Sequence, residues 1–265
     1  MKRRAILAML PSAALTPLLP RLAFGGTMPA MVPASSLKPS EALKKALTSA
    51  RRSTEDIKRD GDRKPAETMD FYGVKAGMKV AELMTASGYF TAVLAEAVGD
   101  TGVVYGQNNA WLRERFENGQ RPLADLIDKQ GYKNIVEVNA ELEDPKLPAG
   151  LDAVFIVMMY HDVVWMNVDR AAMNRAIFKT LKPGGIFGVI DHVAPRGTGL
   201  TEVNKTHRIE RHVVVDEISA AGFQLVEETD LLANPKDPLT VSVFQQELRG
   251  HTNQFVLKFR KGTAQ

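Results

Sequence analysis

Apolar residues recur along this chain in two spacings, which predict two kinds of element. Short continuous apolar runs predict buried strands at residues 79–83, 102–106, 135–138, 153–160, 186–190, 223–228 and 254–260. Apolar residues three and four positions apart predict helices at residues 40–50, 65–73, 89–98, 122–129, 169–181 and 215–222. Five strand–helix alternations closed by two neighbouring strands indicate a three-layer α/β sandwich.

The segment from residue 79 to 91 has the pattern of a nucleotide-binding turn. An apolar strand ends near Glu82, the small residues Thr85, Ala86 and Gly88 follow, and a helix begins at Tyr89. A ligand can approach the backbone of such a loop, and the N-terminus of the helix points at it. Only one glycine stands where such loops usually carry three, so an ordinary strand-to-helix turn is the alternative interpretation.

The first 34 residues have the layout of a cleavable signal peptide. A basic tip at residues 2–4 precedes an apolar stretch and then small residues, with cleavage expected after Ala34 or after Gly25. The apolar stretch is too short for a spanning helix, so no permanent membrane anchor is expected. The paired arginines also resemble a twin-arginine signal. The sequence therefore predicts export, with the periplasm as destination.

Composition narrows the function classes. The 265 residues contain no cysteine, which excludes a disulfide framework, thiolate zinc sites and a cysteine nucleophile. The formal net charge of +3 becomes −1 when the four basic residues of the predicted signal peptide are removed. A nearly neutral mature protein without a basic stripe gives no reason to expect a nucleic-acid partner.

Residues 35–73 form a predicted helical extension ahead of the main domain at residues 74–265. Ser40 is a suitable N-cap for its first helix. A charged run further on contains Arg59, Asp60, Arg63 and Lys64. This run is either a solvated surface or a segment that folds over the mouth of the nucleotide crevice.

Several short motifs occur in an order that is typical of one protein family. They are Arg59-Asp60, Arg63-Lys64-Pro65, Gly88-Tyr89 with Thr91, Tyr160-His161-Asp162 with Trp165, Leu181-Lys182-Pro183-Gly184-Gly185, Asp191-His192, His207-Arg208-Ile209, and Phe255-Val256-Leu257 with Phe259-Arg260. Over residues 50 to 261 the chain resembles a bacterial family of often exported class I S-adenosylmethionine-dependent methyltransferases. The resemblance implies a Rossmann-like, seven-stranded, mostly parallel sheet with an antiparallel last strand, and S-adenosylmethionine as cofactor.

The resemblance also implies which residues hold the cofactor. The methionine part would lie against Glu82, Thr85, Ala86, Gly88 and Tyr89. The ribose would meet Gln107 and Asn108, and the adenine would meet residues 139–141, which include Asn139 and Glu141. Most such folds have an acidic residue at the ribose position, and an amide lacks the charge that strengthens this hydrogen bond.

Four further residues are candidates for catalysis. His161, Asp162, Asp191 and His192 stand at the predicted ends of neighbouring strands, where an acceptor would face the methyl group. Imidazole can take a proton near neutral pH, so one histidine is expected to act as base. A metal site that also includes His207 is the alternative, but no HxxxH or HExxH spacing supports it, and no metal is assigned.

Two function classes follow from these patterns. The first is an S-adenosylmethionine-dependent methyltransferase that acts on a small molecule. The second is an exported binding protein that has retained the fold and lost the chemistry, because S-adenosylmethionine is made in the cytoplasm. The sequence contains no pattern that assigns an oligomeric state.

Overall fold

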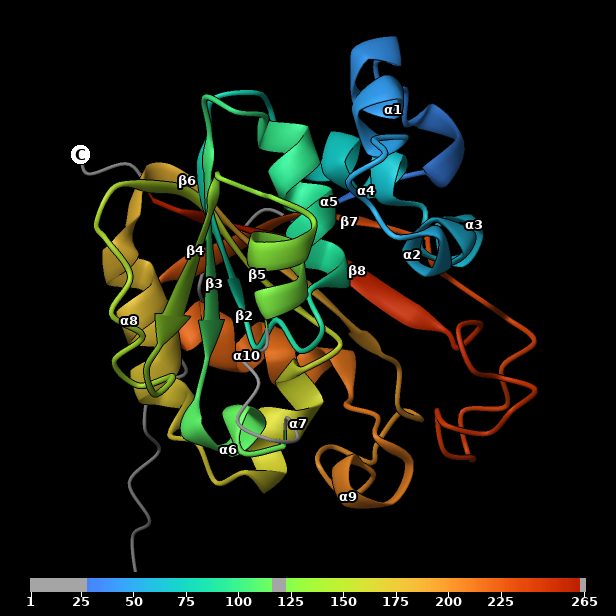
Figure 1. Cartoon of the computed structure of the whole chain (residues 1–265). Coiled ribbons are helices and arrows are strands. Elements are labelled where there is room, and N and C mark those ends of the chain that lie inside the picture. The colour runs from blue at the N-terminus through green and yellow to red at the C-terminus, as the bar shows by residue number, and fades with distance from the viewer. Residues whose placement is uncertain (1–27, 116–122, 263–265) are drawn as a thin grey trace, which may run out of the picture.

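The computed structural model describes residues 28–115 and 123–262, which form a mixed sheet covered by helices on both faces (Figure 1). The strands within these residues are β1 (Ala30–Val32), β2 (Lys79–Leu83), β3 (Val103–Asn108), β4 (Ile135–Asn139), β5 (Leu151–Val157), β6 (Leu181–His192), β7 (Phe223–Thr229) and β8 (Gln254–Lys261). Their order across the sheet is β1-β7-β8-β6-β5-β2-β3-β4.

The direction of the strands confirms the predicted Rossmann-like sheet. Strand β8 runs antiparallel to β6 and β7, and every other described pair is parallel. The predicted number of seven strands is wrong, because the described residues already form a sheet of eight. The additional strand is β1, which pairs with the edge strand β7 although its three residues fall inside the predicted signal peptide.

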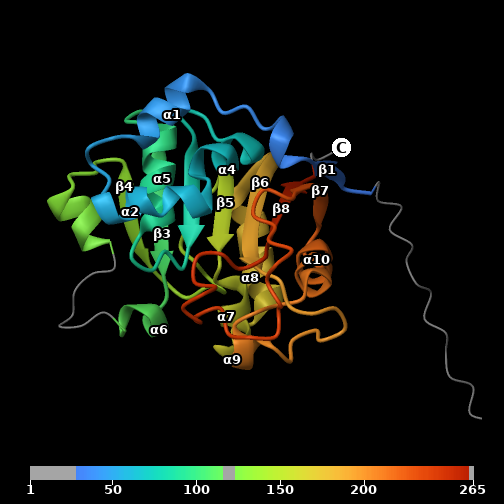
Figure 2. The ribbon, with the colours of Figure 1, turned by 90° about the vertical axis from the view of Figure 1, so that its right-hand side faces the viewer.

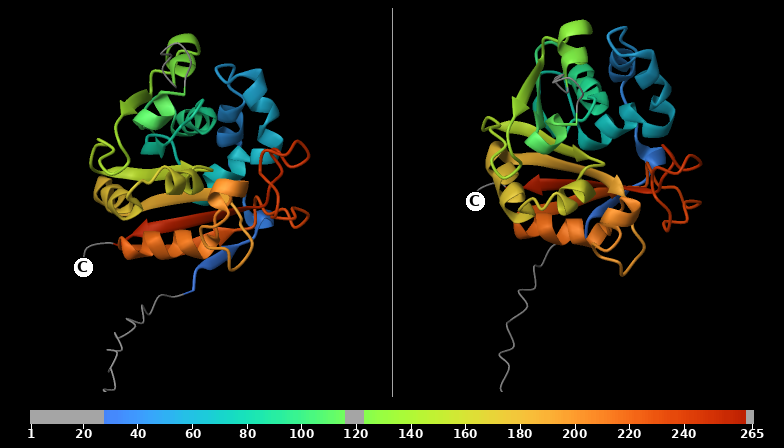
Figure 3. Two further views of the ribbon diagram at one scale, coloured as in Figure 1. Left: turned by 90° about the horizontal axis from the view of Figure 1, so that it is seen from below. Right: turned by 60° about the horizontal axis from the view of Figure 1, so that its bottom comes forward.

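Two apolar clusters, one on each face of the sheet, make the three layers (Figures 2 and 3). One face carries α1 (Glu41–Leu47), α4 (Pro65–Tyr72) and α5 (Tyr89–Val98), and the opposite face carries α8 (Arg170–Thr180) and α10 (Arg211–Ala220). The shorter helices are η1 (Ala34–Ser36), α2 (Thr54–Lys58), α3 (Asp60–Arg63), α6 (Ala110–Arg113), η3 (Asp125–Lys129), α7 (Tyr160–Trp165) and α9 (Val203–Thr206).

Helix α5 has the bounds that the sequence predicts, 89–98. All ten of its residues are buried, since it packs on the sheet and is covered by the N-terminal helices. The Ser40 hydroxyl accepts a hydrogen bond from the backbone N–H of Leu43, which confirms the predicted cap of α1. Pro65 begins α4, and Gly73 ends it in the left-handed conformation.

The end of the fourth predicted strand is wrong. The apolar run continues to Tyr160, but β5 ends at Val157 and Tyr160 begins α7. Met158 has a φ of +54°, and this left-handed residue turns the chain out of the sheet. His161 and Asp162 therefore lie in the first turn of a short helix and not on the strand.

The chain that follows the helix predicted at residues 169–181 enters the sheet without a connecting turn. Helix α8 ends at Thr180, and β6 begins at once with Leu181, which pairs with Leu151 of β5. A register irregularity follows, and Gly184 takes the left-handed φ of +76° there. Glycine tolerates this conformation, and the irregularity lies near the start of the strand.

Two sequence predictions concern segments outside the described residues. Most of the predicted signal peptide, residues 1–27, and the start of the helix predicted at 122–129 belong to them. Within residues 28–115 and 123–262, no helix combines the length and apolar character that crossing a membrane requires.

Candidate active site

The carboxyl ends of β2 and β5 open a crevice in the middle of the sheet. Each strand is followed by a methionine with positive φ, Met84 at +55° and Met158 at +54°. The N–H of Met84 donates to the Gln107 carbonyl at 2.7 Å, and the N–H of Met158 donates to the Ile190 carbonyl at 2.7 Å. The chain thus leaves β2 and β5 through the same backbone conformation. Helices α6, α7 and α9 lie beyond the carboxyl ends of the strands (Figure 1).

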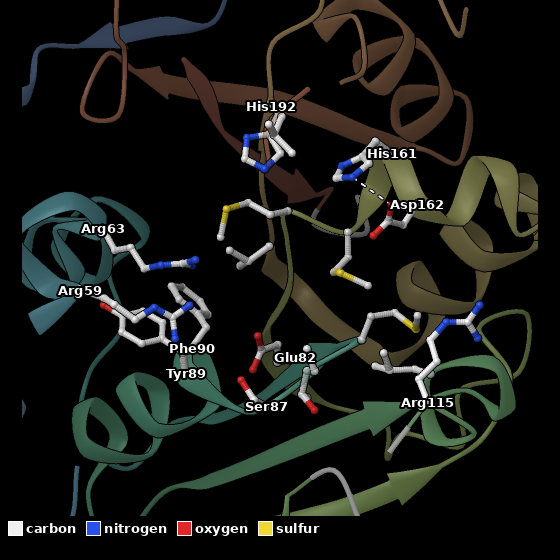
Figure 4. A pocket seen from close by; sticks show the side chains of 18 of the residues that line it. Arg59, Arg63, Glu82, Ser87, Tyr89, Phe90, Arg115, His161, Asp162 and His192 are labelled. Atoms are coloured by element: carbon white, nitrogen blue, oxygen red, sulfur yellow. Dashed lines mark ion pairs between the residues drawn. The ribbon is translucent and has the colours of Figure 1, made fainter. Parts of the chain in front are cut away.

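A cavity of about 390 Å³ occupies this crevice (Figure 4). Its volume is in the range of small-molecule sites. Seven of the residues predicted from the sequence line it: Glu82, Thr85, Ala86, Tyr89, His161, Asp162 and His192. The structure therefore brings together the loop after β2 and the polar residues that follow β5 and end β6.

The fully buried carboxylate of Asp191 organises the catalytic candidates. Its oxygens accept hydrogen bonds from the backbone N–H groups of His161, at 2.8 Å, and His192, at 2.7 Å. Nδ1 of His161 lies 2.7 Å from Oδ1 of Asp191, and Nε2 of His161 lies 3.0 Å from Oδ1 of Asp162. Asp191 does not line the cavity but fixes the position of both histidines.

The two histidines have opposite protonation preferences. Burial opposes the charge of His161, but Asp191 and Asp162 outweigh it and raise the pKa of His161 to about 10. Burial lowers the pKa of His192 to about 4 despite the attraction of Asp191. At neutral pH His161 therefore retains its proton, which disfavours the predicted role of base, whereas His192 is neutral.

Hydrogen bonds also orient the His192 ring. Nδ1 lies 2.7 Å from the Thr252 hydroxyl, which accepts a second hydrogen bond from the Gln254 amide at 3.2 Å. With Nδ1 engaged in this way and the residue lining the cavity, Nε2 is the ring nitrogen available to a ligand.

Glu82 and Arg63 both line the cavity. Burial raises the pKa of Glu82 to about 8, although the Thr91 hydroxyl donates to its carboxylate and Arg63 attracts its negative charge. Burial, with the nearby charge of Arg59, lowers the pKa of Arg63 to about 10. At neutral pH Arg63 is therefore charged and Glu82 is mostly protonated, and a cationic ligand group beside Glu82 would favour its ionised form.

The charged run of the N-terminal extension contributes to the cavity wall. The guanidinium groups of Arg59 and Arg63 lie 4.5 Å and 4.9 Å from the centre of the Tyr89 ring, and both residues line the cavity (Figure 4). Asp60 instead accepts a hydrogen bond from the Tyr89 hydroxyl, and Lys64 donates to the Leu231 carbonyl. The prediction that this run covers the crevice mouth holds for the two arginines.

The residues predicted for the ribose point into the protein. Gln107 and Asn108 are fully buried and do not line the cavity. The Gln107 amide donates to the Ala140 carbonyl at 2.6 Å, and the Asn108 amide donates to the Thr85 hydroxyl at 2.8 Å. Their polar groups thus connect β3 to the flanking loops.

The residues predicted for the adenine also lie outside the cavity lining. Asn139 is exposed at the end of β4, and the Glu141 carboxylate accepts a hydrogen bond from the N–H of Ala110. Gly88 is needed for another reason than the one predicted. A Cβ there would lie 2.6 Å from Leu126 and 2.9 Å from Leu123, so apolar side chains fill this space.

Two segments to which the sequence analysis assigned no site contribute five residues to the cavity. Trp111, Leu112 and Arg115 come from α6 and the residues after it, and Val243 and Phe244 come from the segment between β7 and β8. Arg115 lies across the cavity from Arg59 and Arg63 (Figure 4). The exposure of Phe244, 62%, is a structural signal of a binding surface, but no periodic pattern marks it in the sequence.

A second cavity of about 590 Å³ adjoins the first. The two share Arg59, Arg63, Ser87, Met158, His192, Val243 and Phe244, and the second continues to Arg249 and Gln254. His192 therefore stands where the two cavities meet. The two cavities are thus continuous, and His192 is among the residues that both contact.

Comparison with known sequences points to methyltransferases. No family model matches the chain. It is 31% identical over 129 residues to the ubiquinone/menaquinone biosynthesis C-methyltransferase UbiE of Haemophilus ducreyi, covering 48% of this chain and 46% of that protein. It is 26% identical over 147 residues to the protein-L-isoaspartate O-methyltransferase of Methanococcus maripaludis, covering 56% and 60%. The chain thus spans about half the length of the curated relatives it matches.

Solved structures share the fold. A SAM-dependent methyltransferase from Aquifex aeolicus superposes with a TM-score of 0.54 at 18% identity and covers 76% of this chain and 97% of its own. The cyclase SpnF gives a TM-score of 0.56 at 14% identity, covering 90% and 100%. The fold is therefore that of the class I methyltransferases, as the resemblance implied. Because a cyclase shares it, the reaction has to be argued from the site.

The raised pKa of Glu82 predicts how stability depends on pH. The folded chain holds a proton on Glu82 between pH 4.5 and about 8 that the unfolded chain has released, so the free energy of unfolding should fall as pH rises through this window. The Glu82→Gln variant lacks this titration and should show a flatter profile in urea unfolding between pH 5 and 8. The exposed Glu55→Gln variant is the control, and parallel profiles for Glu82→Gln and the wild type would contradict the assignment.

Proposed function

We propose that the chain is an S-adenosylmethionine-dependent methyltransferase that acts on a small molecule. The observation that carries the proposal is the pair of adjoining cavities with His192 at their junction. A methyl transfer requires two ligands in contact, and both volumes are in the small-molecule range. The relatives in sequence and the fold support the same reaction class.

The first cavity suits the cofactor chemically. S-adenosylmethionine carries a sulfonium and an ammonium cation, whose charge would favour ionisation of the buried Glu82, and a carboxylate, which matches Arg59 and Arg63. The apolar side chains of Trp111 and Leu112 suit the adenine ring. When bound, the cofactor supplies an activated methyl group on a good leaving group.

The second cavity would take the methyl acceptor, and His192 would remove its proton. In the tautomer whose Nδ1–H donates to the Thr252 hydroxyl, Nε2 is the acceptor that faces the cavities. Asp191 fixes the backbone of His192, and His161 keeps its charge between two carboxylates instead of serving as base. Of the two histidines that the sequence offered as the base, His192 is therefore the one we propose.

Binding of S-adenosylmethionine tests the assignment of the first cavity. Calorimetry on the wild type should show one site, and Arg63→Gln should weaken it by about 10- to 100-fold, because a hydrogen bond to a charged group contributes about 1.5–3 kcal/mol. Lys58→Gln, an exposed change one position before Arg59, should bind like the wild type.

No binding at millimolar S-adenosylmethionine would contradict the proposed enzyme. The exported binding protein without chemistry would then be the better interpretation. Equal affinities for Arg63→Gln and Lys58→Gln would instead retain the enzyme and reject the role of Arg63.

Turnover tests the role of His192. His192→Ala should lower kcat by about 100- to 10,000-fold while S-adenosylmethionine affinity stays within a few-fold, as expected for loss of a general base. Formation of S-adenosylhomocysteine with a panel of small hydroxyl and amine acceptors is the measurement. His212→Ala, an exposed histidine paired with Glu210, is the matched control. Unchanged kcat in His192→Ala would mean that another group, or positioning alone, explains the reaction.

We further propose that the protein is exported and matures after Gly25, not after Ala34. Strand β1 pairs with β7, and the N–H of Ala34 donates to Asp230 at 2.7 Å, so cleavage after Ala34 would remove β1 from the sheet. Mass spectrometry of the periplasmic protein should find Gly26 as the first residue. An N-terminus at Ser35 would overturn the cleavage site, and an uncleaved cytoplasmic chain would overturn export.

A further inference from the structure

Two histidines and a carboxylate converge beside the first cavity. His161 and Asp162 come from α7, and His207 comes from the end of α9. Oδ1 of Asp162 lies 3.0 Å from Nε2 of His161 and 3.2 Å from Nδ1 of His207. One ligand atom from each of the three residues lies within 4.8 Å of the other two.

These separations match those between ligands of one metal ion. Two donor atoms that are each about 2.1 Å from an ion, at tetrahedral or octahedral angles, lie roughly 3.0–3.4 Å apart. Both histidine–aspartate distances fall in this range. An ion would replace the protons that the two imidazoles share with Asp162, so only small movements are needed.

Further residues hydrogen-bond to the proposed ligands and orient them, as is usual in metal sites. Oδ1 of Asp191 lies 2.7 Å from Nδ1 of His161, and this carboxylate–histidine contact leaves Nε2 to face the ion. The Trp165 indole donates to Asp162 at 2.9 Å and holds that carboxylate. The His207 ring packs on Phe244 with the ring centres 4.7 Å apart.

We propose that His161, Asp162 and His207 bind one divalent transition-metal ion of the Zn²⁺ or Fe²⁺ type. Two imidazole nitrogens and one carboxylate oxygen favour such ions over Mg²⁺ and Ca²⁺, which prefer oxygen ligands alone. The proposal does not rest on the proposed methyl transfer, although a bound ion would take the place of the proton that His161 otherwise holds towards Asp162. Its test therefore needs no S-adenosylmethionine, and either proposal can fail without the other.

Because the proposed site lies on the cavity wall, a molecule in the cavity can complete the coordination of the ion. His161 and Asp162 line the cavity wall, and three protein ligands leave at least one coordination position for water or a substrate oxygen. The sequence did not assign this site because His207 is 45 residues from Asp162, and only the fold brings the two together.

Metal titration of the whole chain tests the proposal. After removal of metals with a chelator, the protein is titrated with Co²⁺, followed by absorbance, and with Zn²⁺, followed by calorimetry. The wild type should bind one ion per chain. Asp162→Asn and His207→Asn should each weaken binding by at least about 100-fold, and Asp191→Asn by about 10- to 100-fold, as found for groups behind metal ligands.

The variants separate loss of a ligand from loss of the fold. His207 has a φ of +56°, which asparagine tolerates, so His207→Asn should melt like the wild type and decides the outcome if Asp162→Asn does not fold. His212→Asn alters an exposed histidine that also pairs with a carboxylate, and it should bind metal like the wild type. Absence of binding in the wild type, or wild-type affinity in His207→Asn, would overturn the proposal.

Discussion

The site depends on the buried carboxylate of Asp191. Ionised groups are costly to bury unless hydrogen bonds compensate for the lost water, and Asp191 receives two backbone N–H groups and the His161 ring. These contacts join the end of β6 to the start of α7, which follows the neighbouring strand β5. One side chain thus fixes the distance between the two strand ends and the orientation of His161 and His192.

A second network attaches the N-terminal helices to the cavity. The buried guanidinium of Arg52 donates to both oxygens of Asp60 at 2.7 and 2.6 Å, and the Tyr89 hydroxyl donates to the same carboxylate at 2.7 Å. Because Tyr89 begins α5, this network fixes α3 relative to the loop after β2. Arg59 and Arg63 reach the cavity as a result.

The fold was largely predictable because, along most of the chain, the spacing of the apolar residues matches the positions that are buried. Helix α5 and the parallel strands follow directly from the spacing of apolar residues. The errors occur where one backbone conformation overrides that spacing, as at Met158, whose positive φ ends β5 inside an apolar run. Strand β1 was missed because a three-residue edge strand has too few positions to show a period.

The candidate site was predictable only in part. Glu82, His161 and His192, which the sequence places at or near strand ends, do line the cavity, because parallel strands place their carboxyl ends at one edge. The direction of a side chain depends on its packing partners, so the inward turn of Gln107 could not be inferred from the sequence. The pKa difference between the two histidines likewise arises from burial and from contacts across the fold.

Arg59 and Arg63 line the cavity but belong to the N-terminal helices, and this limits how the cavity could be transferred to another protein. Helix α4 shares a core with α5, and the Tyr72 hydroxyl donates to the Val189 carbonyl at 3.1 Å, inside the sheet. A chimaera that takes only the strands and helices after Val74 would therefore lose the arginines and also expose the apolar face that α4 covers. The lining of this cavity therefore depends on two stretches of chain that pack on each other.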